Sequence, residues 1–279
     1  MAKDHGKELK LEMKIFDCIT FFEENRHADL RFNILNDCID YFVICEGLFD
    51  HKGKKKKINF NINNYPLFKK KIIHIICPKF PKKMNPWDRQ AYQRDYILKK
   101  IKIAKDDDLI LFSDPDEIPN PKKIKNLILK KKYLIFLQNL YYYKINLQDI
   151  NLGNNWEGTR GCLKKNLHSI NYMRQKVLKK NLKYKFWRID KEKNIQIIND
   201  GGWHFSYLLT PCEIQRKIKT FAHTEYNKKR FTNLKIIKNK IKKGLDLFNR
   251  DIFFIKKKLD QTFPKYILKN KKNFYKWIV

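Results

Sequence analysis

The 279-residue sequence predicts an α/β fold in which helices cover both faces of a mostly parallel central sheet. Short apolar runs that stop at Pro, Gly or acidic residues are typical of buried strands, and between residues 13 and 113 they alternate with segments of helical periodicity. Each run is apolar throughout rather than at every second position, so both faces of the sheet are expected to be covered. The hydrophobic fraction of 43% is sufficient for such a core.

The first half of the chain is expected to follow the order β-α-β-loop-β-α-β. A helical stripe of apolar residues predicts the first helix, and Pro86 with Asp88 near its start favours the second. The strands are expected at 13–22, 41–45, 71–78 and 109–113, and the helices at 26–37 and 85–102.

The second half shows a less regular pattern. Thr210 and Glu213 suit the N-cap and third position of a helix whose first residue is Pro211, with an apolar face of Ile214, Ile218, Phe221 and Ala222. The other expected elements are a Lys-rich helix after Pro121, a strand from Tyr133 that runs on to Tyr143, a loop at 146–161, short strands at 184–189 and 195–198, a glycine-containing loop at 200–206 and a Lys-rich helical tail from Lys228.

The net charge of +33, from 62 Lys and Arg against 29 Asp and Glu, favours anionic partners. A basic, non-enzymatic binder of nucleic acid or acidic polysaccharide is therefore an alternative to an enzyme. No RNP segment or Cys/His finger is present, so no specific nucleic acid is expected. The Lys- and Phe-rich tail also suits peripheral contact with an anionic membrane.

The cysteines and the N-terminus favour a cytoplasmic protein. None of the six cysteines forms a CxxC pair, and reduced thiols are expected. Residues 1–12 are charged and contain no apolar stretch of a signal peptide, and no run of 18 apolar residues occurs.

Three acids, Asp114, Asp116 and Glu117, come directly after the apolar run 109–113. They are expected at the carboxyl end of a buried strand, because the prolines that follow prevent the strand from continuing. Ligands bind at such strand ends in open α/β sheets, and a hard divalent cation prefers oxygen ligands. This stretch alone is equally compatible with two interpretations. One is a metal site that holds a diphosphate, and the other is a solvated acidic turn.

Known nucleotide-binding and phosphatase patterns do not account for these acids. The sequence contains neither GxGxxG nor GxxxxGK[ST]. Haloacid-dehalogenase phosphatases also use a DxD motif, but on the first strand and followed by Thr or Val. Here the motif follows the fourth expected strand, and Ile118 comes after Glu117.

Three further residues are candidates for catalysis or metal binding. His204 follows two glycines and lies between aromatic residues, so it is either a core histidine or the imidazole that completes a Mn-type site. Glu157 and Asp200 lie in glycine-rich segments, and each is either a surface acid or a general base.

Candidates for donor binding lie on the helix before the acidic motif. Arg94 is positioned either to pair with a phosphate or to face solvent. Trp87 and Tyr92 are suited to stacking on a base or a sugar, and equally to core packing.

Several of these segments together resemble glycosyltransferase family 17, and they occur in that family's order from about residue 13 to the C-terminus. Single segments are weak, but DxDEIP followed by GWHxS is specific. The matching segments are Ile15 to Cys18 with Phe22-Glu23-Glu24, Asp40 to Glu46, Trp87 with Tyr92 and Arg94, Asp114 to Pro119, Gly202 to Ser206, and Lys265 to Asn270.

The resemblance implies a GT-A-like, Rossmann-type domain at 13–279, after the polar extension 1–12 and ending in Lys-rich helices. It further implies an inverting transfer from a nucleotide sugar, UDP-GlcNAc, to a glycan acceptor, with Mn²⁺ or Mg²⁺ as cofactor. Carried over by residue, the metal ligands are Asp114, Asp116 and His204. The donor-binding residues are Glu46, Trp87, Tyr92, Arg94 and Asp114. An inverting displacement needs one base, for which Glu157 is the first choice and Asp200 the second.

Two departures from the animal members of this family affect the expected acceptor. Those members carry a membrane anchor with a lumenal stem and a C-terminal extension, and this sequence shows neither. The identity of the acceptor, N-glycan or other, is therefore left open by the sequence. We expect a cytosolic enzyme that builds a bacterial surface glycan or a viral one, in the latter case in an infected host cell.

Overall fold

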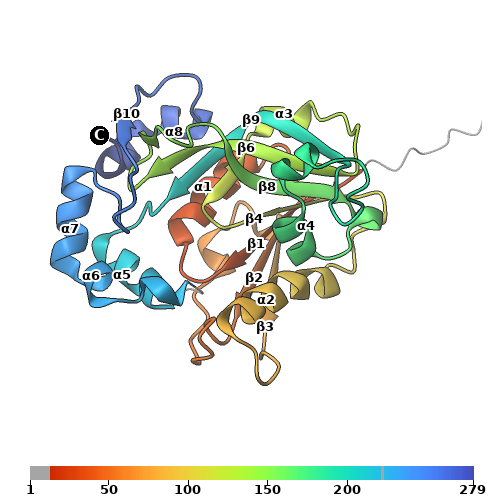
Figure 1. The fold of residues 1–279 in the computed structure, drawn as a ribbon, viewed down its shortest axis with the longest axis horizontal. Coiled ribbons are helices and arrows are strands. Elements are labelled where there is room, and N and C mark those ends of the chain that lie inside the picture. The colour runs from red at the N-terminus through yellow and green to blue at the C-terminus, as the bar shows by residue number, and fades with distance from the viewer. Residues whose placement is uncertain (1–12, 221–222) are drawn as a thin grey trace, which may run out of the picture.

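Ten strands form one sheet within residues 13–220 and 223–279, the parts of the chain that the computed structural model describes (Figure 1). The strands follow the order β10-β7-β6-β8-β4-β1-β2-β3, while β9 pairs with β6 and with β5. The predicted α/β fold class is confirmed. The predicted polar extension, residues 1–12, lies outside the described residues.

Four parallel strands, β3-β2-β1-β4, form one half of the sheet. The side chain of Asn85 caps the second helix by accepting hydrogen bonds from the N–H groups of Trp87 and Asp88, so this helix begins where the sequence predicts. The elements of this half are β1 (Ile15–Phe21), α1 (Asn25–Leu35), β2 (Tyr41–Gly47), β3 (Ile72–Cys77), α2 (Pro86–Lys100) and β4 (Leu109–Ser113), all of them predicted.

Hydrophobic clusters cover both faces of this parallel half. Successive side chains of a strand point to opposite faces, and in β1 Ile19 packs in the cluster that contains α1, whereas Cys18 packs in the cluster that contains α2. Leu30 of α1 and Ile97 of α2 are both fully buried in these clusters. The continuous apolar runs in the sequence reflect this burial on two sides.

Beyond β4 the sheet is mixed. β8 (Trp156–Leu163) runs antiparallel between β4 and β6 (Tyr133–Tyr142), and β9 (Ile195–Ser206) runs parallel to β6. The remaining elements of this region are β5 (Glu117–Pro119), α3 (Pro121–Lys125), β7 (Leu147–Asp149), α4 (Ile170–Lys176) and β10 (Phe254–Lys256).

The expectation of a loop throughout 146–161 is wrong, because this range contains β7 and most of β8. The glycines of β8 mark close packing. A Cβ on Gly158 would lie 2.0 Å from the Oε1 of Gln138, and one on Gly161 would lie 2.6 Å from a methyl carbon of Leu111. Glycine in a strand therefore indicated close approach of neighbouring side chains here, not a turn.

Two expectations around β9 are also corrected. Residues 184–189 form turns instead of a strand, and residues 200–206 are the second part of β9 instead of a loop. Asp200 and Gly202 have φ angles of 50° and 142°, and the pairing of β9 with β6 shifts register beside them. A Cβ on Gly202 would lie 2.2 Å from the carbonyl oxygen of Ile118, so this glycine allows β5 to pair closely with β9.

A buried ion pair connects α1 to β1 and β5. The Nε of Arg31 lies 2.7 Å from Oδ2 of Asp17, and both side chains are fully buried. The Nη1 of Arg31 also donates to the carbonyl oxygen of Glu117 at 2.6 Å. Because a buried ion pair is stable only when its hydrogen-bonding groups are satisfied, this contact restricts where β5 can lie.

The C-terminal region adds a third hydrophobic cluster around Ile214, Ile218 and Phe231. The predicted helix start is confirmed, since the N–H of Thr210 donates to Glu213 Oε2 at 2.7 Å. Its predicted face residues Phe221 and Ala222 lie outside the described residues. The helices here are α5 (Pro211–Thr220), α6 (Lys229–Thr232), α7 (Leu234–Lys243) and α8 (Lys265–Lys269).

All six cysteines lie within the described residues and carry free thiols. Among the helices of the described chain, none has the length and apolar composition needed to cross a membrane.

Candidate active site

A cavity of about 260 Å³ opens at the carboxyl ends of the parallel strands. Its lining includes Thr20 at the end of β1, Gly47 at the end of β2 and Asp114 directly after β4. β2 and β3 follow on one side of β1 and β4 lies on the other, so the strand order reverses at β1. Open α/β sheets bind ligands at such a switch point.

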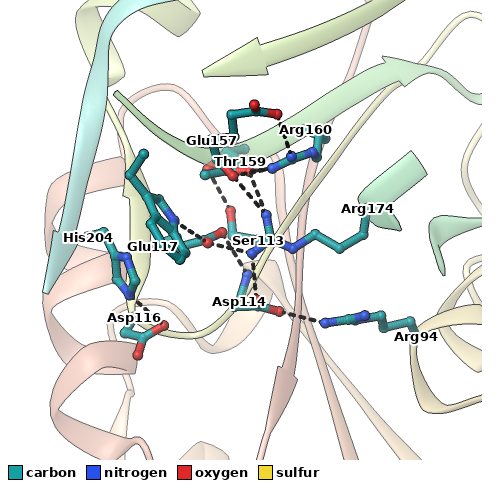
Figure 2. Close-up of polar contacts among 12 residues, drawn as sticks. Arg94, Ser113, Asp114, Asp116, Glu117, Glu157, Thr159, Arg160, Arg174 and His204 are labelled. Carbon is teal, nitrogen blue, oxygen red and sulfur yellow. Dashed lines mark hydrogen bonds and ion pairs between the residues drawn. The ribbon is translucent and has the colours of Figure 1, made fainter. Parts of the chain in front are cut away.

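Asp114 is held by two arginines that come from different helices (Figure 2). Its Oδ1 accepts a hydrogen bond from Arg94 of α2 at 3.2 Å, and its Oδ2 accepts one from Arg174 of α4 at 2.7 Å. Burial raises the pKa of Asp114, but the charges of Arg174 and Arg94 outweigh it and hold this pKa well below its ordinary value. Asp114 is therefore ionised, and both of its carboxylate oxygens are engaged.

Glu117 supports the turn that carries the two aspartates. It is fully buried, and its Oε1 accepts hydrogen bonds from Trp156 Nε1 at 2.8 Å and from Arg174 at 2.7 Å. Its Oε2 accepts a hydrogen bond from the backbone N–H of Asp114 at 3.1 Å. These contacts fix the turn against β8 and α4, so Glu117 positions the site and is not available as a metal ligand.

Asp116 faces the cavity from the same turn but has different partners. Its Oδ2 lies 3.1 Å from Nζ of Lys217 on α5, and its Oδ1 lies 3.5 Å from Nε2 of His204 on β9. Burial raises the pKa of Asp116, but the neighbouring positive charge of Lys217 and contacts with His204 hold it well below its ordinary value.

Strand pairing brings His204 to Asp116. In the antiparallel pair of β5 and β9, Glu117 lies opposite His204, and the N–H of Phe205 donates to the carbonyl oxygen of Asp116 at 2.8 Å. The His204 ring also packs on the ring of Trp156, with centroids 4.5 Å apart. His204 is thus fixed by backbone hydrogen bonds rather than carried on the loop that the sequence suggested.

The geometry suits a divalent cation at Asp116 and His204 more than at Asp114. Two ligands of one ion stand roughly 3 to 3.5 Å apart when each lies about 2.1 Å from it, which agrees with the 3.5 Å between Asp116 Oδ1 and His204 Nε2. Among the described residues, no group of three or more His, Cys, Asp or Glu side chains is arranged to hold a metal. Mg²⁺ and similar ions commonly use one or two carboxylates and complete their coordination with substrate phosphates and water.

The predicted donor-binding residues Arg94 and Glu46 are both buried. Arg94 reaches Asp114, as described above. Glu46 holds the segment that follows β2, since its carboxylate accepts hydrogen bonds from the side chain of Lys56 and from the N–H groups of Asn59 and Phe60. Lys56 lines the cavity, so Glu46 helps to hold this lysine in the cavity wall.

Trp87 and Tyr92, the other two predicted donor-binding residues, lie on α2 in different surroundings. Trp87 is 45% exposed, and its ring meets that of the cavity-lining His223 edge-on at 4.5 Å. Tyr92 packs in the cluster on the α2 face of the sheet, against Phe80 and Tyr96. Trp87 is thus next to the cavity wall, whereas Tyr92 serves the core.

Neither of the two acids predicted as catalytic base belongs to the described lining of the cavity. Glu157 points away from Asp116 and His204 and forms an ion pair with Arg160 at 3.1 Å (Figure 2). Asp200 is exposed at the irregular part of β9, where its carbonyl oxygen accepts a hydrogen bond from Asn120.

The family profile of glycosyltransferase family 17 matches residues 1–276, nearly the whole chain. The chain belongs to glycosyltransferase family 17. The match confirms the family that the sequence motifs indicate.

Three mammalian proteins named beta-1,4-mannosyl-glycoprotein 4-beta-N-acetylglucosaminyltransferase are similar to this family 17 chain. Those of Rattus norvegicus and Homo sapiens are each 25% identical over 116 residues, and that of Mus musculus is 24% identical. The match covers 38% of this chain and only about a fifth, 22%, of each relative.

Solved structures superpose weakly on this fold. A glycosyltransferase involved in the glycosylation of the major capsid of PBCV-1 covers 67% of this chain, over 81% of its own length, with 11% identity and a TM-score of 0.33. A putative glucose-1-phosphate thymidylyltransferase from Bacillus anthracis in complex with a sucrose covers 67% of this chain and 86% of its own, with 8% identity and a TM-score of 0.35. Superpositions this weak carry no functional inference.

Three residues at the family 17 site were not found by sequence reasoning: Arg174, Lys217 and His223. Arg174 is separated from Glu117 by 57 residues and Lys217 from Asp116 by 101. The charge pattern could not single them out, because basic residues are spread along the whole chain. His223, whose Nδ1 lies 2.7 Å from Oε1 of Glu225, belongs to none of the segments that mark the family.

Proposed function

We propose that this glycosyltransferase is an inverting, metal-dependent enzyme that moves GlcNAc from UDP-GlcNAc to a hydroxyl of a glycan. The observation that carries the proposal is Asp116, a buried and ionised carboxylate at the strand-order switch point, facing both His204 and Lys217. The names of the mammalian relatives support GlcNAc as the sugar.

Asp116 and His204 would hold the divalent cation, Mn²⁺ or Mg²⁺. When bound, such an ion neutralises the diphosphate and stabilises the charge that develops on it as the sugar leaves. Asp114 contributes indirectly, because its oxygens are occupied by Arg94 and Arg174. Those two contacts keep the turn rigid, so Asp116 needs little rearrangement to meet a ligand.

Cationic side chains in the cavity wall complement a diphosphate. Lys217 and Lys56 both line the cavity, and each is held by a carboxylate, Asp116 and Glu46 respectively. Hydrogen bonds to charged groups are stronger than those between neutral groups. We propose that the ammonium group of Lys217, which contacts Asp116 in this structure, also donates a hydrogen bond to the leaving diphosphate.

Inversion in one displacement requires a single base for the acceptor hydroxyl. Glu157 and Asp200 were proposed from the sequence, but they lie outside the described cavity lining. We propose His223 instead. It lines the cavity, and Glu225 lies 2.7 Å from its Nδ1, an arrangement that orients an imidazole for proton transfer.

The direct test is turnover of UDP-GlcNAc by the full chain, with a glycan acceptor and without one. We expect UDP release that requires Mn²⁺ or Mg²⁺ and stops with EDTA, and a thermal shift with UDP-GlcNAc because a bound donor stabilises the native state. Equal turnover in EDTA would contradict the metal requirement. A shift with another nucleotide sugar alone would contradict GlcNAc as the sugar.

A further inference from the structure

An exposed turn between residue 183 and β9, which we call the aromatic turn (residues 184–189), places apolar side chains in solvent. Phe186 is 85% exposed, Trp187 57% and Ile189 94%. The rings of Phe186 and Trp187 pack edge to face at 5.1 Å, so the two form one projecting apolar group. Soluble domains seldom leave large apolar side chains clustered in this way unless the cluster contacts a partner.

Internal hydrogen bonds hold the aromatic turn in shape. The ammonium group of Lys193 donates to the carbonyl oxygens of Lys185, Phe186 and Arg188 at 2.7, 3.1 and 3.0 Å. The N–H of Ile189 also donates to the carbonyl oxygen of Trp187 at 2.9 Å. The apolar side chains are therefore presented by an ordered backbone, which lowers the entropy that a partner must remove on binding.

Basic residues surround these apolar side chains. Residues 179–193 contain seven Lys or Arg residues and two acids, a net charge of +5. Both acids are already paired, Asp190 with Arg188 at 2.7 Å and Glu192 with Lys132 at 3.8 Å. The charged groups of Lys185 and Arg188 also lie over the rings of Trp187 and Tyr184, 4.8 and 5.4 Å from the ring centres.

We infer that the aromatic turn docks this protein on the surface of an anionic lipid bilayer. Phe186, Trp187 and Ile189 would enter the boundary between headgroups and acyl chains, and the surrounding lysines and arginines would contact anionic headgroups. Ile189 favours a bilayer over a nucleic acid, because an aliphatic side chain gains from acyl chains but offers no ring for stacking on a base. This inference does not depend on the transfer reaction.

The structure favours the aromatic turn over the C-terminal tail that the sequence indicated as a membrane contact. The most exposed aromatic residues of the tail are Phe253 and Tyr275, both 66% exposed and far apart in sequence. They lack the clustering of three apolar side chains within four residues that the aromatic turn shows. Charge alone gives weak, salt-sensitive attachment, and the apolar insertion adds to it.

Sedimentation of the full chain with lipid vesicles tests the inference. Vesicles of phosphatidylcholine alone are compared with vesicles that also contain phosphatidylserine, at low and at high salt. The variants are Phe186→Ser with Trp187→Ser, and, as a matched control in the tail, Phe253→Ser with Tyr275→Ser. Circular dichroism and thermal unfolding confirm that each variant folds, which is expected because all four side chains are exposed.

We expect the unchanged chain and the tail variant to sediment with the anionic vesicles and to bind them less at high salt. The turn variant is expected to bind about a hundredfold more weakly, since each aromatic side chain loses a transfer worth about tenfold. Equal binding by the turn variant, or loss of binding by the tail variant alone, overturns the inference. So does an unchanged chain that fails to sediment with the anionic vesicles, whether or not it associates with itself or with RNA through Phe186 and Trp187.

Discussion

The parallel half and the mixed half of the sheet contribute different parts of the candidate site. The parallel half, β1 to β4, supplies the cavity floor and the turn that carries Asp114 and Asp116. The mixed half and its helices supply His204, Arg174 and Lys217, which partner those aspartates together with Arg94 of the parallel half. The first half thus forms the cavity and carries its two aspartates, while the second half supplies most of the charged groups that contact them.

The largest effect is expected for Asp116→Ala. This change removes the carboxylate that contacts His204 and Lys217 of the second half. We expect turnover of UDP-GlcNAc to fall about a thousandfold, as for other single groups that stabilise charge in a transition state. Asp107→Ala is the control, because that acid lies on the surface in an ion pair with Lys165. Retained turnover in a folded Asp116→Ala protein would place the chemistry elsewhere.

Arg174→Met tests whether the second half also stabilises the first. It leaves the fully buried Glu117 without its guanidinium partner, and we expect the free energy of unfolding to fall by roughly 3 kcal/mol. Arg94→Met should cost less, because Arg94 pairs with the partly exposed Asp114 and not with Glu117. Urea denaturation of both variants measures the difference, and equal losses would argue against the special role of Glu117.

His223→Gln tests the proposed base in the second half. Removal of a general base commonly lowers kcat about a hundredfold or more, and we expect that loss here with little change in KM for the donor. Glu157→Gln and Asp200→Asn serve as comparisons and should stay within a few-fold of the unchanged enzyme. If one of these two variants loses most of its activity while His223→Gln stays active, the substituted acid is the general base and His223 is not.

The smallest effect on activity is expected for Lys217→Met. A hydrogen bond to a charged group is worth about 1.5 kcal/mol, so we expect turnover to fall about tenfold. Lys217→Arg should keep part of the activity, and Lys219→Met, an exposed neighbour on α5, should keep all of it. Higher apparent affinity for Mn²⁺ in Lys217→Met, without loss of turnover, would show that the lysine only competes with the ion.

The sequence predicted the first half better than the second, for physical reasons. Strands that are buried on both faces appear in the sequence as continuous apolar runs. The start of α2 can be recognised from Asn85, Pro86 and Asp88, which form its N-terminal cap and first turn. In the second half, Gly158 and Gly161 suggested a loop, although they permit close packing within a strand. Apolar residues 184–189 suggested a strand, although the fold leaves the largest of them in solvent.

The candidate site shows the same contrast between short motifs and long-range contacts. Asp114 and Asp116 stand next to each other in a short motif, and His204 lies in a second motif that also marks the family. The contacts of Lys217 and Arg174 depend on long-range packing, which no local pattern records. Tyr92 packs in the core and Glu46 contacts Lys56, and the role of either residue in donor binding stays a prediction.

The pairing of β5 with β9 has a consequence for how this protein can change over evolutionary time. Because Glu117 lies opposite His204, the distance between the two halves of the site is set by a ladder of three residue pairs and not by the chain between them. Insertions or deletions between residue 183 and β9, in the stretch that holds the aromatic turn, are therefore expected to leave that ladder in place. Related proteins can therefore differ in the surface that this stretch presents while they keep the same contact between Asp116 and His204.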